Sequence, residues 1–382
     1  MQALVMAHAS FGHNHFFKNN YLFKQWTDAE SILDYLDFAK KFIAKCSEEF
    51  GQEEVELILD SAHALMAQGV FRYERPIKES DDKIRARMRA RFEYERETFN
   101  DLWRTVPELA KTVVVAEADD EEEDLSLPEE NILYYLEKKS PVLADWQKEL
   151  LHIVRTISQY FYPQKQTKIM NEGCATFVHY HIMNELHERG QISDGSLLEF
   201  IQSHTGVVFQ PTYGDPRYSG FNPYALGFAM MCDIKRICTE PAEEDREWFP
   251  DIAGCGDWRT VLKDAWANYR DESFILQFLS PKLMRDFRLF AIHDEESGSF
   301  AEISRIHNEE GYRRVRATLA GMHDVGNLEP NIQVVGADLK GDRTLTLRHT
   351  EHNGKPLDVK ASEEVMLHVE RLWGYGVEMT EE

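Results

Sequence analysis

Apolar residues recur every three to four positions along most of residues 1–290, which is the spacing of an α-helix with one buried face. The clearest example runs from Thr27 to Gly51, where Thr27-Asp28-Ala29-Glu30 has the form of a capping box and Gly51 follows the last periodic residue. A further helix start is predicted at Pro223, with Asn222 as its cap. The same spacing predicts helices over 53–69, 79–103, 131–139, 142–161 and 168–189. Residues 1–290 are therefore predicted to form a large, mostly α domain.

The pattern changes near Phe290, where apolar and polar residues begin to alternate as they do in β-strands. Residues 290–306 predict two strands across a Gly-Ser turn. The segments that follow predict a helix over 309–321, paired strands over 331–339 and 343–350, a helix over 362–373 and a last strand over 376–380. This order predicts a small α+β domain of split-βαβ type over 291–382.

Two segments are dominated by charge. Residues 116–131 contain six consecutive acids and a proline, which cannot build a core, and so predict a linker. The predicted helix over 79–103 carries a run of alternating basic residues followed by glutamates. That run has two interpretations, a partner-binding surface or a solvated helix with i,i+4 ion pairs, and the spacing favours the second.

Composition limits the possible partners and compartments. The chain has 43 basic and 67 acidic residues and a net charge of −24, which repels phosphate backbones and argues against nucleic acid as a partner. No apolar run is long enough for a bilayer, and the first residues lack the basic start of a signal peptide. The five cysteines are scattered without a CxxC pair, which indicates reduced thiols. A cytoplasmic protein without membrane attachment is expected.

The first candidate for chemistry is the segment His8-Ala-Ser-Phe-Gly-His13-Asn-His15. Neutral imidazole is the commonest metal ligand in proteins. His8 and His13 lie five positions apart, about 140° around an ideal helix, so one helical face does not present both. Gly12 offers a point where the helix could break and bring the two rings together. The alternative is a pair of ordinary hydrogen-bonded histidines.

The second candidate is Glu172, which lies beside Gly173 inside an otherwise apolar helix. A buried carboxylate needs a cation, a metal ion or several donors. The string Asn171-Glu172-Gly173 is similar to the helix that supplies a glutamate ligand in gluzincin metallopeptidases, although the HExxH helix that accompanies it there is missing here. His179 is on the same face but roughly 10 Å along the helix axis, so it is predicted to support the ligands rather than bind the ion.

Three groups therefore form the predicted metal site, His8, His13 and Glu172, with a divalent, zinc-like ion as the expected cofactor. The alternative for Glu172 is a salt bridge to a lysine or arginine. Tyr224 is predicted to line the same cavity, because it follows a turn-rich segment and Gly-rich and Pro-rich loops often shape pockets. The remaining candidates for the pocket or its surroundings are His63, His179 and Asn222.

Long segments of the chain resemble the SpoVR family, named for stage V sporulation protein R. They include AHASFGHNHFFKNNYLFKQWTDAESILDYL, LDSAHALMAQGVFRYERP, QKQTKIMNEGCATFVHY, REWFPDIAG, DESFILQFLSPKLMRDFRLF and NLEPNIQVVGADLKGDRTLTLRH. The resemblance covers essentially the whole chain and is to the proteobacterial branch. Family members usually have a further N-terminal segment, so the chain is expected to be shortened there. They also have tryptophan where this chain has Cys174 and Val178, which puts a tight aromatic wall in doubt.

The resemblance implies a biological role without a particular reaction. It implies formation of the spore cortex in sporulating relatives and a starvation or stress response in others, together with a PrkA-type AAA+ serine kinase and a von Willebrand A-like protein as partners. Two functions thus compete: a regulatory protein of that kinase system, and a metal-dependent hydrolase using His8, His13 and Glu172. Only the second requires stoichiometric metal.

Overall fold

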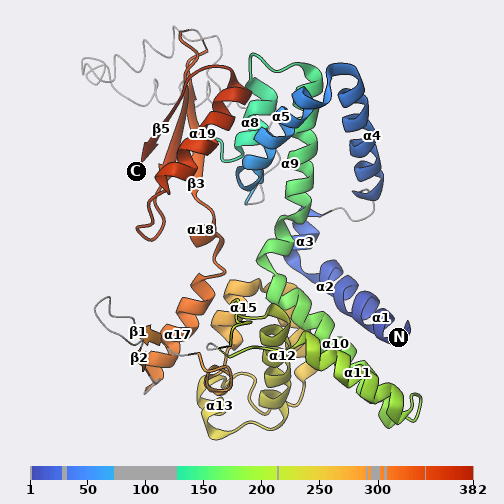
Figure 1. Cartoon of the computed structure of the whole chain (residues 1–382). Helices are drawn as coiled ribbons and strands as arrows, with labels where there is room; N and C mark the ends of the chain where they lie inside the picture. Colours follow the sequence, from blue (N-terminus) through green and yellow to red (C-terminus); the bar gives the residue numbers. More distant parts are fainter. Residues whose placement is uncertain are drawn as a thin grey trace, which may run out of the picture.

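The computed structural model describes residues 2–27, 32–72, 127–212, 215–289, 291–293, 302–304, 308–339 and 341–381. The predicted helix over 79–103 and most of the predicted acidic linker lie outside these residues. Figure 1 shows two lobes joined by the long helix α9 (Asp145–Gln166) on one side and by the segment around α18 (Val325–Leu328) on the other. Each lobe has its own hydrophobic core.

The lower lobe in Figure 1, called the helical lobe below, is built almost entirely of helices. Its core is formed mainly by side chains of α10, α12 and α14–α17. The N-terminal helices cover α10 on one side. The elements are α1 (Gln2–Val5), η1 (Met6–His13), α2 (Asn14–Asn19), α3 (Tyr21–Trp26), α10 (Lys168–Glu188), α11 (Asp194–Val207), α12 (Pro223–Thr239), α13 (Glu243–Trp248), α14 (Trp258–Asn268), α15 (Asp271–Phe278), α16 (Pro281–Asp286), β1 (Ala291–His293), β2 (Glu302–Ser304) and α17 (Glu309–Gly321).

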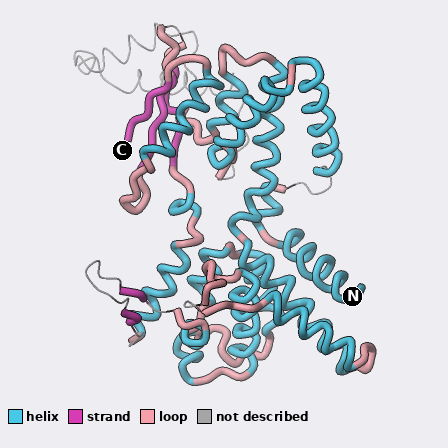
Figure 2. The backbone as a smooth tube through the Cα atoms, in the orientation of Figure 1, coloured by secondary structure: helices cyan, strands magenta, loops and turns pink. Residues whose placement is uncertain are grey.

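The upper lobe, called the sheet lobe, packs helices against one face of a small sheet, as the tube view in Figure 2 shows. The sheet has the order β3-β4-β5, with β3 antiparallel to β4 and β4 parallel to β5. Parallel neighbours require a crossover, and α19 supplies it. The elements are α4 (Ile32–Phe50), α5 (Gln52–Ala64), η2 (Met66–Gln68), α8 (Ile132–Lys139), β3 (Asn331–Ala337), β4 (Leu345–Thr350), α19 (Val359–Trp373) and β5 (Val377–Glu381).

The predicted fold class, a mostly α body with a small α+β part at the C-terminal end, is confirmed. Pro223 begins α12, and the Asn222 side chain accepts a hydrogen bond from the amide of Tyr224, as the sequence predicts. The helix predicted over 53–69 is shorter than expected. It ends at Ala64, and a single 3₁₀ turn continues to Gln68.

The strands do not form one split-βαβ sheet, and this detail of the prediction is wrong. Strands β1 and β2 pair only with each other among the described residues, while β3, β4 and β5 make a second sheet. The reason lies in α17, which follows β2 and packs its Leu319 and Ala320 into the core of the helical lobe. The first hairpin is therefore held in the other lobe, away from β3.

The residues of the two cores do not coincide with the predicted segments 1–290 and 291–382. Helices α5, α8 and α9, from the first segment, bury their apolar faces together with the C-terminal sheet. The end of the predicted linker is part of this packing, because Glu129 exchanges two backbone hydrogen bonds with Val334 of β3, at 2.9 and 2.8 Å. Residues 127–131 are thus packed rather than linker. That residues 1–290 and 291–382 are separable units stays a prediction.

No helix in the described part of the chain is long and apolar enough to span a bilayer.

Candidate metal centre

The first element of the site is a π-helix. Residues Met6–His13 adopt this conformation, in which each amide bonds to the carbonyl five residues earlier. A five-residue repeat brings His8 and His13 to the same side, which an α-helix would not do. The sequence prediction that the two rings need a local change of helix geometry is correct, but Gly12 does not break the helix.

Gly12 instead allows the π-helix to approach α10. A Cβ atom at this position would lie 2.5 Å from the Cα of Ala175, closer than any side chain tolerates. A second close crossing lies one turn away, where Gly227 of α12 meets α10. A Cβ atom at Gly227 would lie 2.2 Å from the carbonyl oxygen of Ile169 and 2.8 Å from the Cα of Gly173. The small residues therefore bring three helices together around Glu172.

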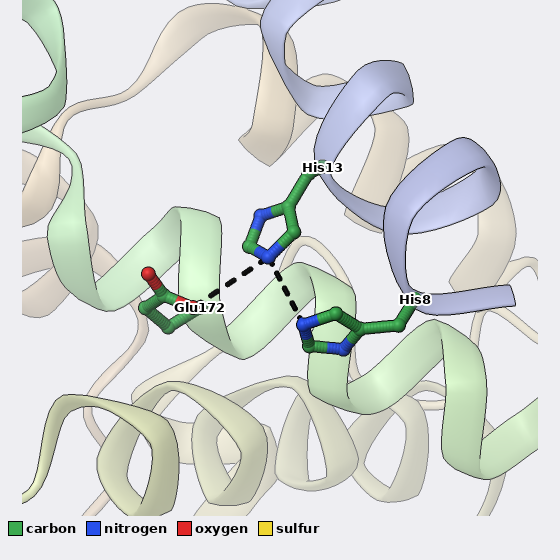
Figure 3. A group of neighbouring side chains, drawn as sticks. All are labelled: His8, His13 and Glu172. Carbon is green, nitrogen blue, oxygen red and sulfur yellow. Dashed lines mark hydrogen bonds and ion pairs between the residues drawn. The ribbon is translucent and has the colours of Figure 1, made fainter. Parts of the chain in front are cut away.

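Figure 3 shows the result: His8 and His13 point from η1 toward Glu172 on α10. One ligand atom from each of the three residues lies within 4.8 Å of the others. His13 Nε2 is 3.1 Å from His8 Nε2 and 3.7 Å from a Glu172 carboxylate oxygen. Donors bonded to one tetrahedral ion at 2.0–2.1 Å lie about 3.3 Å apart, and the two separations at His13 Nε2 are close to this value. The predicted convergence of the three residues is confirmed as geometry.

The outer nitrogen of each histidine has a partner of its own. His13 Nδ1 is 2.8 Å from the side-chain oxygen of Asn171, and His8 Nδ1 is 2.9 Å from His179 Nδ1. His179 Nε2 is in turn 3.1 Å from His204 Nδ1 on α11. Ligand histidines in metalloproteins are commonly oriented in this way by a partner on the second ring nitrogen. His179 thus supports a predicted ligand, as the sequence indicated.

Burial disfavours the charged forms of His8, His179 and His204. It lowers the pKa of His179 to about 3, with additional repulsion from the charged forms of His8, His204 and His13. Burial, followed by the neighbouring His13, also lowers the pKa of His8, and burial lowers that of His204. Neutral imidazole is the form that binds a metal ion.

No lysine or arginine among the residues that the structure describes pairs with Glu172. Its carboxylate lies near His13 and accepts a hydrogen bond from the hydroxyl of Tyr224. Burial, the charge of Glu172 and this hydrogen bond raise the pKa of Tyr224, so its hydroxyl remains a donor. The alternative of a lysine or arginine salt bridge to Glu172 is therefore not what the described residues form.

Asn222 positions Tyr224 rather than contacting the three donors. Its side-chain amide donates to the carbonyls of Val207 and Phe209, at 2.8 and 3.1 Å, while its oxygen caps α12. This ties the start of α12, which carries Tyr224, to the end of α11. His63 was also a candidate for the pocket, but it is exposed on α5 of the sheet lobe and takes no part in the cluster.

Two supporting residues were missed by the sequence reasoning, Asn171 and His204. Asn171 directly precedes Glu172, so the adjacent polar pair inside an apolar helix was an available signal. His204 carried none, because its segment is far from the other histidines in sequence. The departure at Cys174 has a packing explanation: the side chain is fully buried, with its sulfur 4.0 Å from the Gly12 carbonyl oxygen.

Comparison with known proteins identifies the family of the chain. The family described as SpoVR like protein matches residues 1–328, and the SpoVR-like C-terminal domain matches residues 330–382. The chain belongs to the SpoVR family. Among its relatives is "Uncharacterized protein YcgB" of Escherichia coli (strain K12), which is 57% identical over 377 residues, covering 99% of this chain and 73% of the relative. No solved structure matches the chain.

Proposed function

We propose that this SpoVR-family protein is a metal-dependent hydrolase whose His8, His13 and Glu172 hold one divalent, zinc-like ion. A single observation carries the proposal: two imidazole nitrogens and a carboxylate oxygen converge within 4.8 Å, although no lysine or arginine among the described residues pairs with that carboxylate. A cation at this point would balance the charge of Glu172 and take the lone pairs of the two imidazoles, which supports the proposal.

The donor set fits a catalytic ion better than a structural one. Two histidines and one glutamate leave a coordination position for water, and such an ion lowers the pKa of bound water toward 7. The protein's own residues then have separable roles. His8 and His13 bind through Nε2, Asn171 holds the ring of His13, and Tyr224 holds the carboxylate of Glu172 by hydrogen bonding.

The test begins with metal content. Full-length protein, stripped of metal and equilibrated with Zn²⁺, should retain about one ion per chain, measured by mass spectrometry of the metal. His13→Ala and Glu172→Ala should each lose it, while His187→Ala should not, because His187 pairs with Asp194 at the surface, away from the cluster. Equal zinc retention by all four proteins would overturn the proposal.

Activity is tested separately with panels of ester, amide and phosphoester substrates. Hydrolysis that requires Zn²⁺ and disappears in Glu172→Gln is the expected result. A protein that binds zinc stoichiometrically but hydrolyses no member of the panels would favour the second candidate function, in which the ion supports a regulatory protein.

That second candidate is a cytoplasmic regulatory role in starvation or stress, with a PrkA-type AAA+ kinase and a von Willebrand A-like protein as partners. Family membership supports it, and so does a groove between α19 and β5 that could receive a partner. Apolar side chains that include Val359 and Leu367, 72% and 59% exposed, lie beside Glu363, Glu370 and Glu381, and no basic residue lines the groove. Such a surface suits a basic, extended segment added at a strand edge.

The regulatory role is tested by binding between purified proteins. We expect the kinase or its partner protein to bind this chain, and Glu363→Lys with Glu370→Lys to weaken the complex. Binding unaffected by these substitutions would exclude the groove as the contact, and absence of binding to both proteins would contradict the partnership.

A further inference from the structure

Three imidazoles lie in a row behind the candidate metal centre. His8 Nδ1 contacts His179 Nδ1 at 2.9 Å, and His179 Nε2 contacts His204 Nδ1 at 3.1 Å. At the other end, His8 Nε2 faces His13 Nε2 at 3.1 Å. His179 and His204 are only 5% and 7% exposed, so water does not readily replace these contacts.

A row of neutral imidazoles has a direction. Each ring has one N–H donor and one acceptor nitrogen, so a ring bonded through both nitrogens must donate at one and accept at the other. In the first direction His204 donates to His179, His179 donates to His8, and His8 donates from Nε2 to His13. His13 then donates from Nδ1 to Asn171, whose oxygen is 2.8 Å away. Every contact in the row is satisfied, but His8 Nε2 offers no lone pair to a cation.

In the second direction, the donor and acceptor nitrogens of His204, His179 and His8 exchange roles. His8 now donates from Nδ1 to His179, and His179 donates from Nε2 to His204. His8 Nε2 becomes a lone pair, facing the lone pair of His13 Nε2 and the carboxylate of Glu172. This arrangement is repulsive by itself and suits a bound cation.

We infer that loading of the site with a divalent cation reverses the donor direction of the row His8–His179–His204, with His204 as the positioning residue at its far end. The inference rests on the proposed metal site and adds a coupling between that site and α11. His204 touches none of the three metal-binding donors, yet the tautomer of His8 depends on it through His179.

The proton count balances. On reversal, His8 releases its Nε2 proton to solvent. The proton shared by His179 and His8 moves onto His8 Nδ1, and the proton shared by His204 and His179 moves onto His179 Nε2. His204 takes up one proton at Nε2. The three rings hold three protons in both states and remain neutral, so no buried charge is created.

The surroundings of His204 hold its ring in position for this role. Its centroid lies 4.7 Å from that of Phe228, 4.8 Å from that of Tyr180 and 5.6 Å from that of Phe200. Packed rings prevent the imidazole from swinging away from His179. When the tautomer of His8 changes, the His204 ring therefore changes its tautomer and keeps its orientation.

The experiment is ¹⁵N NMR of the histidine rings of the full-length protein, because the two-bond ¹⁵N–¹H couplings distinguish Nδ1–H from Nε2–H. In metal-free protein we expect His8 protonated at Nε2, and His179 and His204 protonated at Nδ1. After addition of Zn²⁺ all three should change to the other nitrogen. Zinc binding with unchanged tautomers at His179 and His204 would overturn the inference alone. Failure to bind zinc would overturn it together with the proposed metal site.

Variants of His204 provide a second readout, zinc affinity measured by competition with a chromophoric chelator. His204→Phe removes both hydrogen-bonding roles and should weaken zinc binding by about tenfold or more, the usual effect of losing an outer partner. His204→Gln should restore most of it, because an amide can donate or accept. His187→Phe, the same change at a surface histidine, is the control. Equal affinities in the Phe and Gln variants would contradict the role of His204.

Discussion

Each lobe contains a glutamate beside a histidine, and the two sites differ in how the negative charge is balanced. In the sheet lobe, Glu137 lies 2.9 Å from Arg155, 2.5 Å from Lys138 and 3.4 Å from His152. In the helical lobe, Glu172 lies 3.7 Å from His13 Nε2, and the other ring nitrogen of His13 is 2.8 Å from the side-chain oxygen of Asn171.

The pKa of Glu137 records the difference. Burial alone would raise it, but hydrogen bonds from His152, Lys138 and Arg155 lower it to about 2. That carboxylate is compensated within the protein and needs no further cation. Glu172 faces the hydroxyl of Tyr224 and the imidazole of His13, and no lysine or arginine of the described residues lies beside it. A glutamate beside histidines is thus a structural ion pair when arginine and lysine complete it, and a candidate metal ligand when they do not.

The largest effect is expected on removing the balancing charge from the sheet lobe. Arg155→Met removes the arginine that pairs with the buried carboxylate of Glu137 and should lower the free energy of unfolding by about 3 kcal/mol. Urea denaturation measures this loss, and hydrogen exchange of the amides in α8 and α9 shows where the structure is destabilised. Arg189→Met removes the exposed pair with Glu185 and should cost less than about 0.5 kcal/mol. Equal losses of unfolding free energy in Arg155→Met and Arg189→Met would show that the Glu137 ion pair stabilises the protein no more than an exposed pair does.

The pH dependence of the same cluster should be nearly as large. The pKa of Glu137 is lowered in the folded state, so its stabilisation is complete above the unfolded value of 4.5 and is lost as pH falls from there through about 2. The depression corresponds to about 3 kcal/mol. Glu137→Gln should therefore be less stable than the unchanged protein by about this amount at pH 7, with the gap closing as pH falls. A gap that is constant with pH would contradict the ion pairing.

Zinc should stabilise the helical lobe by a smaller amount. A ligand that binds only the folded state at 100 times its Kd adds about 2.7 kcal/mol to the free energy of unfolding. Chemical denaturation with and without Zn²⁺ measures this difference, and His13→Ala should show none of it. A comparable gain in that variant would mean that zinc binds elsewhere.

The smallest effect is expected from neutralising Glu172 without metal. Glu172→Gln removes a charge that no described lysine or arginine balances and keeps an oxygen for the Tyr224 hydroxyl. The unfolding free energy of the metal-free protein should change by less than about 0.5 kcal/mol, against about 3 kcal/mol for Glu137→Gln at the same pH. A loss comparable to that of Glu137→Gln would show that Glu172 is an ordinary structural ion pair.

The elements were largely predictable because their signals are local. Helical spacing, the Asn222 cap before Pro223 and the alternating strands each depend on a few neighbouring residues, and the structure confirms these elements where it describes the chain. The choice of Glu172 was also local, since a buried carboxylate beside Gly173 in an apolar helix needs a cation, a metal ion or several donors wherever the helix packs. Its convergence with His8 and His13 was a hypothesis from residue chemistry, and the packing of the helices decided it.

Tertiary structure decided the rest. The pairing of β1 with β2 alone, the packing of α17 into the helical lobe and the merging of α5, α8 and α9 with the C-terminal sheet depend on which apolar faces meet. The π-helical turn that aligns His8 with His13, and the position of His204 behind His179, have the same origin. Amino-acid spacing determines which side of its own helix a residue occupies, but only the packing of helices distant in sequence determines what that side faces.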